Sequence, residues 1–147
     1  MTRYPEEINI TINKEIEILR NNQNNNTDMM IVAFVNNELV GNVVIRCERN
    51  HIKLKHRAVL GISVKGKYWN KGIGNELLRE IIEQARVIGY EQIELGVFSD
   101  NEKARKLYEK YGFEVWGNLK NAFKLKDGTY RDEILMGRSI NSRIGSF

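Results

Sequence analysis

The chain has 147 residues and a mass of 17.1 kDa, the size of one ordinary domain. Hydrophobic residues make up 41% and charged residues 29%, a composition that excludes a disordered chain. The 23 basic and 19 acidic residues are interspersed and leave a net charge of +4, which suits an anionic ligand but does not indicate nucleic acid. One cysteine and two histidines exclude an intramolecular disulfide and argue against a metal site.

The expected location follows from the same composition. No apolar run approaches the roughly 18–20 residues that span a bilayer, and the first six residues lack the pattern of a signal peptide. A single cysteine, Cys47, is typical of a reducing compartment. We therefore expect a cytoplasmic protein without a membrane partner, and one domain over residues 1–147.

The first half of the chain predicts one helix and three strands. Thr11 is a typical N-cap, and it is followed by apolar residues at helical spacing, namely Ile12, Ile16 and Leu19. The expected strands are at 30–35, 39–47 and 57–64, the first two joined by a turn at Asn36-Asn37. Gly41 inside the second strand predicts a bulge or a close backbone approach.

The second half alternates between helices and strands. The expected elements are a helix at 75–87, a strand at 92–98, a helix up to 111, an extended segment at 113–117 and a hairpin of 122–125 with 132–136. The first of these helices carries a broad apolar stripe of Leu77, Leu78, Ile81, Ile82 and Ala85. The order predicts an α/β fold with a mixed sheet.

Residues 64–75 combine the end of a strand, two glycines and the start of a helix. A helix N-terminus presents unpaired N–H groups to anions, and Gly72 and Gly74 would let phosphate oxygens approach the backbone. Lys67 and Lys71 add positive charge. The segment lacks the Gly-Lys-Ser/Thr ending of a nucleotide P-loop and the third glycine of a dinucleotide fingerprint. A tight turn that packs the helix would explain the glycines equally well.

A second segment, residues 101–113, reads Asn-Glu-Lys-Ala-Arg-Lys-Leu-Tyr-Glu-Lys-Tyr-Gly-Phe. It places Asn101 at the start of a helix and Tyr108 on its apolar face. Taken alone, that face predicts packing against a core.

Together the two segments resemble the GCN5-related N-acetyltransferase (GNAT) superfamily. Its acetyl-CoA signature, Arg/Gln-x-x-Gly-x-Gly/Ala, aligns with residues 69–74, where Trp69 replaces the usual Arg or Gln. Its pattern Asn-x-x-Ala-x-x-Leu-Tyr-x-x-x-Gly-Phe aligns without a gap with residues 101–113. Residues 127–136 are similar to the closing hairpin of many small bacterial members. The resemblance covers about residues 29–137.

The resemblance implies a single GNAT-like domain, with a mostly antiparallel sheet that opens between the strands near Val64 and Val97 and is flanked by helices. It implies acetyl-CoA as co-substrate, its pantetheine arm on the first of the two strands and its pyrophosphate on the glycine loop. The implied cofactor-binding residues are Ile62, Ser63, Val64, Trp69, Asn70, Lys71, Gly72, Ile73, Gly74, Asn75, Asn101 and Tyr108. Asn101 would either touch the pantetheine or set the second helix.

The implied reaction is direct attack of a neutral primary amine on the thioester. Tyr108 would protonate the departing thiolate as general acid, and a backbone N–H near Ile62 would stabilise the oxyanion. Many relatives carry a glutamate on the strand before the glycine loop, but residues 57–64 contain none. Glu94 on the next strand is the expected catalytic base, with His56 or a chain of waters as alternatives.

The N-terminal part departs from the family, which has a strand and two helices before the hairpin that begins near Met30. Only about one helix fits here, so we expect the first strand and the first helix to be missing. That would leave a sheet edge open to another chain, including a second copy in a homodimer.

The sequence thus predicts an acetyl-CoA-dependent N-acetyltransferase that acts on a small amine or an amino-acid-like acceptor. A protein N-terminal acetyltransferase, similar to those that modify ribosomal proteins, is one alternative. A non-catalytic acyl-CoA-binding module is another, favoured by the short N-terminus and by the missing strand glutamate. No metal or nucleic-acid partner is expected.

Overall fold

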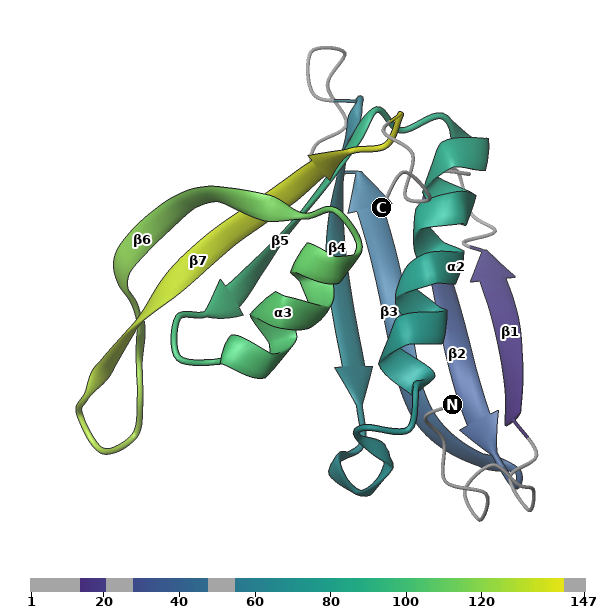
Figure 1. Cartoon of the computed structure of the whole chain (residues 1–147), viewed down its shortest axis with the longest axis horizontal. Helices are drawn as coiled ribbons and strands as arrows, with labels where there is room; N and C mark the ends of the chain where they lie inside the picture. Colours follow the sequence, from purple (N-terminus) through teal and green to yellow (C-terminus); the bar gives the residue numbers. More distant parts are fainter. Residues whose placement is uncertain (1–13, 21–27, 48–54, 142–147) are drawn as a thin grey trace. The chain divides into compact units, whose positions relative to one another are not determined.

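The structure is a computed structural model that describes residues 14–20, 28–47 and 55–141 (Figure 1). It divides into two compact units. Unit 1 comprises residues 1–46 and 61–84, and unit 2 comprises residues 47–60 and 85–147. Strand β4 (Arg57–Val64) and helix α2 (Ile73–Ile88) each contribute residues to both units.

Unit 1 contains the strand order β1-β2-β3-β4. The strands before β4 are β1 (Lys14–Arg20), β2 (Met29–Val35) and β3 (Glu38–Cys47). β1 and β2 are antiparallel, as are β2 and β3. The hairpin turn between β2 and β3 consists of Asn36 and Asn37, with φ of 52° and 70°. Asparagine tolerates this left-handed conformation, which confirms the predicted turn.

The segment expected to form a helix through Ile16 and Leu19 is instead the strand β1, so that prediction is wrong. The physical reason is the alternation of Glu15, Ile16, Glu17 and Ile18, a period of two with β-branched residues that suits a strand. A strand therefore precedes the hairpin after all. It pairs with β2 along its length, so β2 is not an open sheet edge. Residues 1–13 and 21–27 lie outside the described residues.

The sequence predicted a bulge or a close backbone approach at Gly41, and the structure has both. The register between β2 and β3 shifts between Ala33, which pairs with Gly41, and Phe34, which pairs with Leu39. Val40 is therefore the extra residue of a bulge. A Cβ built on Gly41 would lie 2.9 Å from the main-chain oxygen of Ser63 on β4. Only glycine therefore fits this approach between β3 and the second half of β4.

Helix α2 buries the apolar stripe that the sequence predicted, and it begins two residues earlier than expected. Leu77, Leu78, Ile81 and Ile82 have no exposed surface, and α2 runs along the strands of unit 1 (Figure 1). Each such burial stabilises the fold by about 1.5–3 kcal/mol. This packing fixes the glycine loop that leads into the helix.

Unit 2 contains the strand order β4-β5-β7-β6, with one helix between β5 and β6. Its elements after β4 are β5 (Gln92–Phe98), α3 (Glu102–Lys110), β6 (Glu114–Lys124) and β7 (Tyr130–Ser139). β5 pairs in parallel with β4 and antiparallel with β7, and β6 and β7 are antiparallel. The expected fold class, a mixed and mostly antiparallel sheet with helices, is confirmed.

The last hairpin differs from its prediction in one respect. β6 is one strand with two register shifts, where the sequence suggested separate extended segments. The carboxylate of Asp132 on β7 accepts the Asn121 N–H at 2.9 Å and the Asn118 side-chain amide at 3.4 Å. These bonds hold the wider bulge, so the strand continues through its polar middle.

We predict that Gly41→Ala destabilises the protein by about 1–3 kcal/mol, because its methyl group would collide with the backbone of β4. Gly61→Ala is the matched control, since a Cβ at Gly61 meets no atom within 4 Å. Thermal unfolding of both variants measures the difference. Equal midpoints would contradict the close approach at Gly41.

Candidate active site

The loop between β4 and α2, in unit 1, contains a 3₁₀ turn η1 (Gly66–Tyr68) and two left-handed residues. Asn70 has φ of 65° and Gly72 has φ of 85°, whereas Lys71 between them does not have a positive φ. Such alternation turns successive N–H groups toward one side and makes an anion-binding concavity. The left-handed Asn70 was not foreseen from the sequence.

The same loop leaves room for a ligand at the start of α2. The Glu76 N–H donates to the Gly72 carbonyl at 3.1 Å, so the N–H groups ahead of it belong to the helix N-terminus. A Cβ built on Gly72 would meet no atom within 4 Å. The loop residues thus offer unpaired main-chain donors and open space of the kind that an anion such as a diphosphate requires.

A carboxylate on β3 anchors the turn before this loop. Glu38 accepts the Lys65 ammonium at 3.2 Å and the Tyr68 hydroxyl at 3.0 Å, and the Lys67 ammonium lies 3.7 Å away. The hydrogen bonds from Lys65 and Tyr68 hold the pKa of Glu38 below its ordinary value. No local pattern indicated Glu38, because its contact with Lys65 joins residues 27 positions apart.

Trp69, which replaces the family's Arg or Gln, is hydrogen-bonded to the last residue of β4. Its indole N–H donates to the Val64 carbonyl at 2.7 Å, while 57% of the residue stays exposed. This bond occupies one main-chain acceptor of the segment expected to meet the pantetheine arm. The Ser63 carbonyl of the same segment lies against Gly41 of β3.

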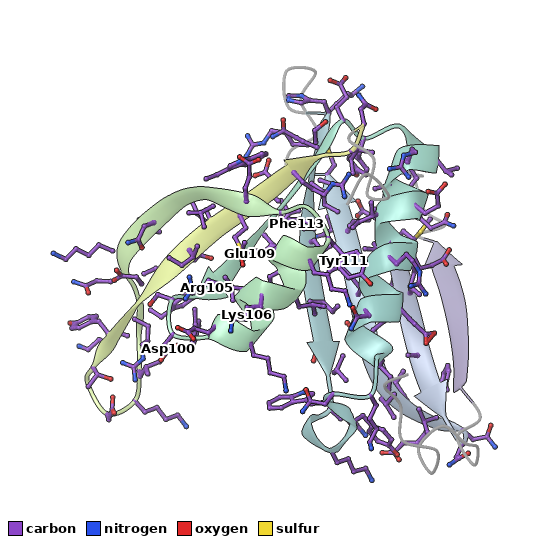
Figure 2. The ribbon with its side chains drawn as sticks, in the orientation of Figure 1. Asp100, Arg105, Lys106, Glu109, Tyr111 and Phe113 are labelled. Carbon is purple, nitrogen blue, oxygen red and sulfur yellow. The ribbon has the colours of Figure 1, made fainter. Side chains whose placement is uncertain are left out.

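In unit 2, Asn101 sets the start of α3. Its side-chain oxygen accepts the Ala104 N–H at 3.1 Å, so it is the N-cap that the sequence suggested. Arg105, Lys106 and Glu109 project from the same helix (Figure 2). Lys106 and Glu109 are exposed, whereas Tyr108 of the same helix is buried.

Tyr108 lies on the inner side of α3, and only 8% of the residue is exposed. Its ring meets Phe113 edge-on at 5.9 Å between centroids. Burial raises the pKa of the phenol, so Tyr108 is protonated at neutral pH. Among the described residues the Tyr108 hydroxyl makes no hydrogen bond. The inner side of α3 thus carries a protonated phenol.

The C-terminal end of α3 is held by Arg138 of β7, which is 2% exposed. Its Nη1 donates to the Tyr111 carbonyl at 2.8 Å, and its Nε donates to the Ser139 carbonyl at 2.9 Å. Gly112 follows with φ of 90°, which closes the helix. The position of Tyr108 therefore depends on an arginine that no sequence motif indicated.

Glu94 is bound to an arginine. Arg57 Nε donates to Glu94 Oε2 at 2.6 Å and Arg57 Nη2 to Oε1 at 2.7 Å, and the Gln92 amide adds a bond at 3.2 Å. The Arg57 hydrogen bonds hold the pKa of Glu94 below its ordinary value. This pair ties β4 to β5, and a carboxylate in this setting has a weak affinity for protons.

The predicted site residues therefore fall into two groups. Residues 62–64 and 69–75 belong to unit 1 and surround the glycine loop, whereas Glu94, Asn101 and Tyr108 belong to unit 2. Within the described ranges no three His, Cys, Asp or Glu residues gather into a metal-binding group. No helix in those ranges is long and apolar enough to cross a membrane.

The chain resembles known acetyltransferases. The sequence model described as "Acetyltransferase (GNAT) family" matches residues 3–113. The L-amino acid N-acetyltransferase AaaT of Escherichia coli is 37% identical over 109 residues, which cover 74% of this chain and 66% of that protein. A GNAT-family acetyltransferase structure from Streptococcus pneumoniae superimposes with a TM-score of 0.73 at 32% identity, covering 77% of this chain and 67% of that one.

A third similarity concerns the fold alone. A Salmonella typhimurium protein, solved with its cofactor acetyl-CoA, is 22% identical with a TM-score of 0.73, over 79% of this chain and 66% of that one. The fold and the glycine loop thus agree with the family match, and the chain belongs to the GNAT acetyltransferase family. It spans 66% of the length of the E. coli relative, and 41% of a Bacillus subtilis N-acetyltransferase called YsnE.

We predict that Glu94→Gln lowers stability at pH 7 by about 1 kcal/mol, because it removes one half of the Arg57 ion pair. The pKa of Glu94 is depressed, so its contribution is complete above the unfolded pKa near 4.5 and disappears as pH falls through the lower folded pKa. Thermal unfolding of the wild type and of the variant from pH 7 to pH 3 should therefore converge. Glu114→Gln, at an exposed position, serves as control. A gap that stays constant to pH 3 would contradict this reading.

Proposed function

We propose that the chain is an acetyl-CoA-dependent N-acetyltransferase that transfers an acetyl group to a primary amine. The observation that carries this proposal is the loop at the start of α2, where Asn70 and Gly72 are both left-handed and the space above Gly72 is open. Family membership and the Salmonella protein's cofactor support acetyl-CoA as the ligand.

In this proposal the loop residues from Trp69 to Asn75 hold the pyrophosphate through main-chain N–H groups, and Lys71 adds charge. The main chain of β4 around Ile62 meets the pantetheine arm. Asn101 acts chiefly by capping α3, a contact that accounts for its place in the motif.

The amine attacks the thioester carbonyl, a C–N bond forms and the C–S bond breaks. Tyr108 donates its phenolic proton to the departing sulfur; its raised pKa keeps the phenol protonated until then, and within the described residues the hydroxyl makes no hydrogen bond. An N–H near Ile62 stabilises the oxyanion. Glu94 was the expected base, but its pairing with Arg57 favours the alternatives, so His56 or a chain of waters takes the proton that the amine loses.

The proposal also includes the class of amine that accepts the acetyl group. The name of the E. coli relative supports an amino-acid-like acceptor, and a small amine or a protein N-terminus are the alternatives. A cytoplasmic location, a single domain over residues 1–147 and a homodimer are likewise proposals that rest on the family and on composition.

Replacement of Tyr108 tests the chemistry. We predict that Tyr108→Phe lowers kcat by about 10²–10⁴-fold, because the thiolate then leaves without a positioned acid, whereas acetyl-CoA binding is retained. Thiol release with a panel of primary amines measures kcat, and calorimetry measures the binding. Tyr130→Phe, at an exposed tyrosine of the last hairpin, is the control.

Unchanged kcat in a folded Tyr108→Phe protein would remove Tyr108 from the mechanism. Tight acetyl-CoA binding without thiol release from any amine would instead support the acyl-CoA-binding module.

A further inference from the structure

Trp69 stands where the family has Arg or Gln, and its side chain has a fixed place in unit 1. The indole N–H donates to the Val64 carbonyl at 2.7 Å, while 57% of the residue is exposed. The main-chain N–H of Trp69 already donates to the Gly66 carbonyl at 3.1 Å, at the end of the turn η1. What Trp69 presents to a ligand is therefore chiefly its ring.

The peptide groups around Val64 show on which edge of β4 this ring lies. The Lys65 N–H donates to the Val40 carbonyl of β3 at 2.8 Å. The Val64 carbonyl belongs to the same peptide group, and in a planar trans peptide the C=O and the N–H point in opposite directions. Among the described residues no peptide bond is cis. The Val64 carbonyl, and the indole that binds it, therefore lie on the edge of β4 that faces away from β3.

The second half of β4 is the part of the strand that we assign to the pantetheine arm. The ladder between β4 and β5 ends at Val59, so Val64 lies beyond it. Trp69 is bonded to the last residue of β4 and is followed directly by Asn70, the first left-handed residue of the glycine loop. Its ring thus lies where the strand and the loop meet.

The ring is also the apolar surface that the loop offers. Among residues 65–72, Trp69 is the large hydrophobic side chain that is exposed, whereas the Lys65 and Lys67 ammonium groups lie close to the Glu38 carboxylate. In CoA the diphosphate is joined to the rest of the pantetheine arm through the pantoyl group, which has a carbon that bears two methyl groups. An exposed indole suits such a group, because their contact removes apolar surface of both from water.

We propose that the Trp69 indole packs against the pantoyl methyl groups of acetyl-CoA, at the junction of β4 and the glycine loop. The inference rests on the proposed acetyl-CoA-dependent function and adds a side-chain contact to its main-chain contacts. It also gives a chemical role to the tryptophan that replaces Arg or Gln, namely an apolar contact in place of a polar side chain.

Binding calorimetry with two ligands tests the contact. Acetyl-CoA contains the pantoyl group, whereas adenosine 3′-phosphate 5′-diphosphate, the nucleotide part of CoA, has the diphosphate and no pantetheine. Trp69→Ala should raise the Kd of acetyl-CoA about tenfold, the factor that roughly 50 Å² of uncovered apolar surface gives. It should leave the Kd of the nucleotide unchanged, because the loop still holds the diphosphate.

Trp69→Phe is the matched variant, since it keeps an aromatic ring and loses the hydrogen bond to Val64. It should bind acetyl-CoA more tightly than Trp69→Ala does. If the bond to Val64 carried the effect, the two variants would be equally weak. A variant that harmed the loop itself would weaken the binding of both ligands by the same factor.

Fluorescence reports on the ring directly. The chain has two tryptophans, Trp69 and Trp116, so Trp116→Phe leaves Trp69 as the sole tryptophan. Acetyl-CoA should shift the emission of this variant to shorter wavelength, because the ligand displaces water from the indole, and the nucleotide should not. The comparison of Kd values does not depend on this variant.

An unchanged Kd of acetyl-CoA in Trp69→Ala would overturn the inference and leave the proposed function standing. An equal loss for the two ligands, a Trp69→Phe protein as weak as Trp69→Ala, or a Trp69 emission that acetyl-CoA does not shift would do the same. A wild-type protein that binds neither ligand would overturn the proposed function and the inference with it.

Discussion

Strand β4 contributes its first residues to unit 2 and its last residues to unit 1, and each half has its own contacts. Its first residues pair with β5 in a parallel ladder of three residue pairs, from Arg57↔Gln92 to Val59↔Glu94. A ladder this short is weak, and the Arg57–Glu94 ion pair reinforces it. Its last residues lie against Gly41 of β3 and lead into the glycine loop. One strand thus contributes to the interior of unit 2 and leads into the glycine loop of unit 1.

Two glutamates of unit 2 illustrate how surroundings decide the role of a carboxylate. Glu94 is bound by an arginine and an amide, so its charge is neutralised and its affinity for protons is low. Glu133 of β7 lies over Gly96 and is paired directly with Phe98 and Leu119, with Arg131 next to it on the same face of the strand. The first carboxylate joins two strands through an arginine, whereas the second makes no hydrogen bond or ion pair within the described residues.

Local patterns explain what the sequence predicted well. The turn at Asn36-Asn37, the apolar stripe of α2 and the Asn101 cap each depend on neighbouring residues, and the structure contains all three. The helix predicted at Ile16 failed because a short window contained both a helical spacing and a period of two, and pairing with β2 favours the strand. The neighbours of Glu133 could not be predicted from the sequence, because they depend on the register of three strands.

The central claim is that the loop before α2 binds acetyl-CoA, and thermal unfolding with and without acetyl-CoA tests it most directly, with ATP as a phosphate-bearing comparison. A ligand of the native state at 100 times its Kd adds about 2.7 kcal/mol of stability, and each kcal/mol raises the Tm of a domain of this size by about 2–4 °C. The account predicts a clear rise with acetyl-CoA and a much smaller one with ATP. No rise at saturating acetyl-CoA, or an equal rise with ATP, would contradict it.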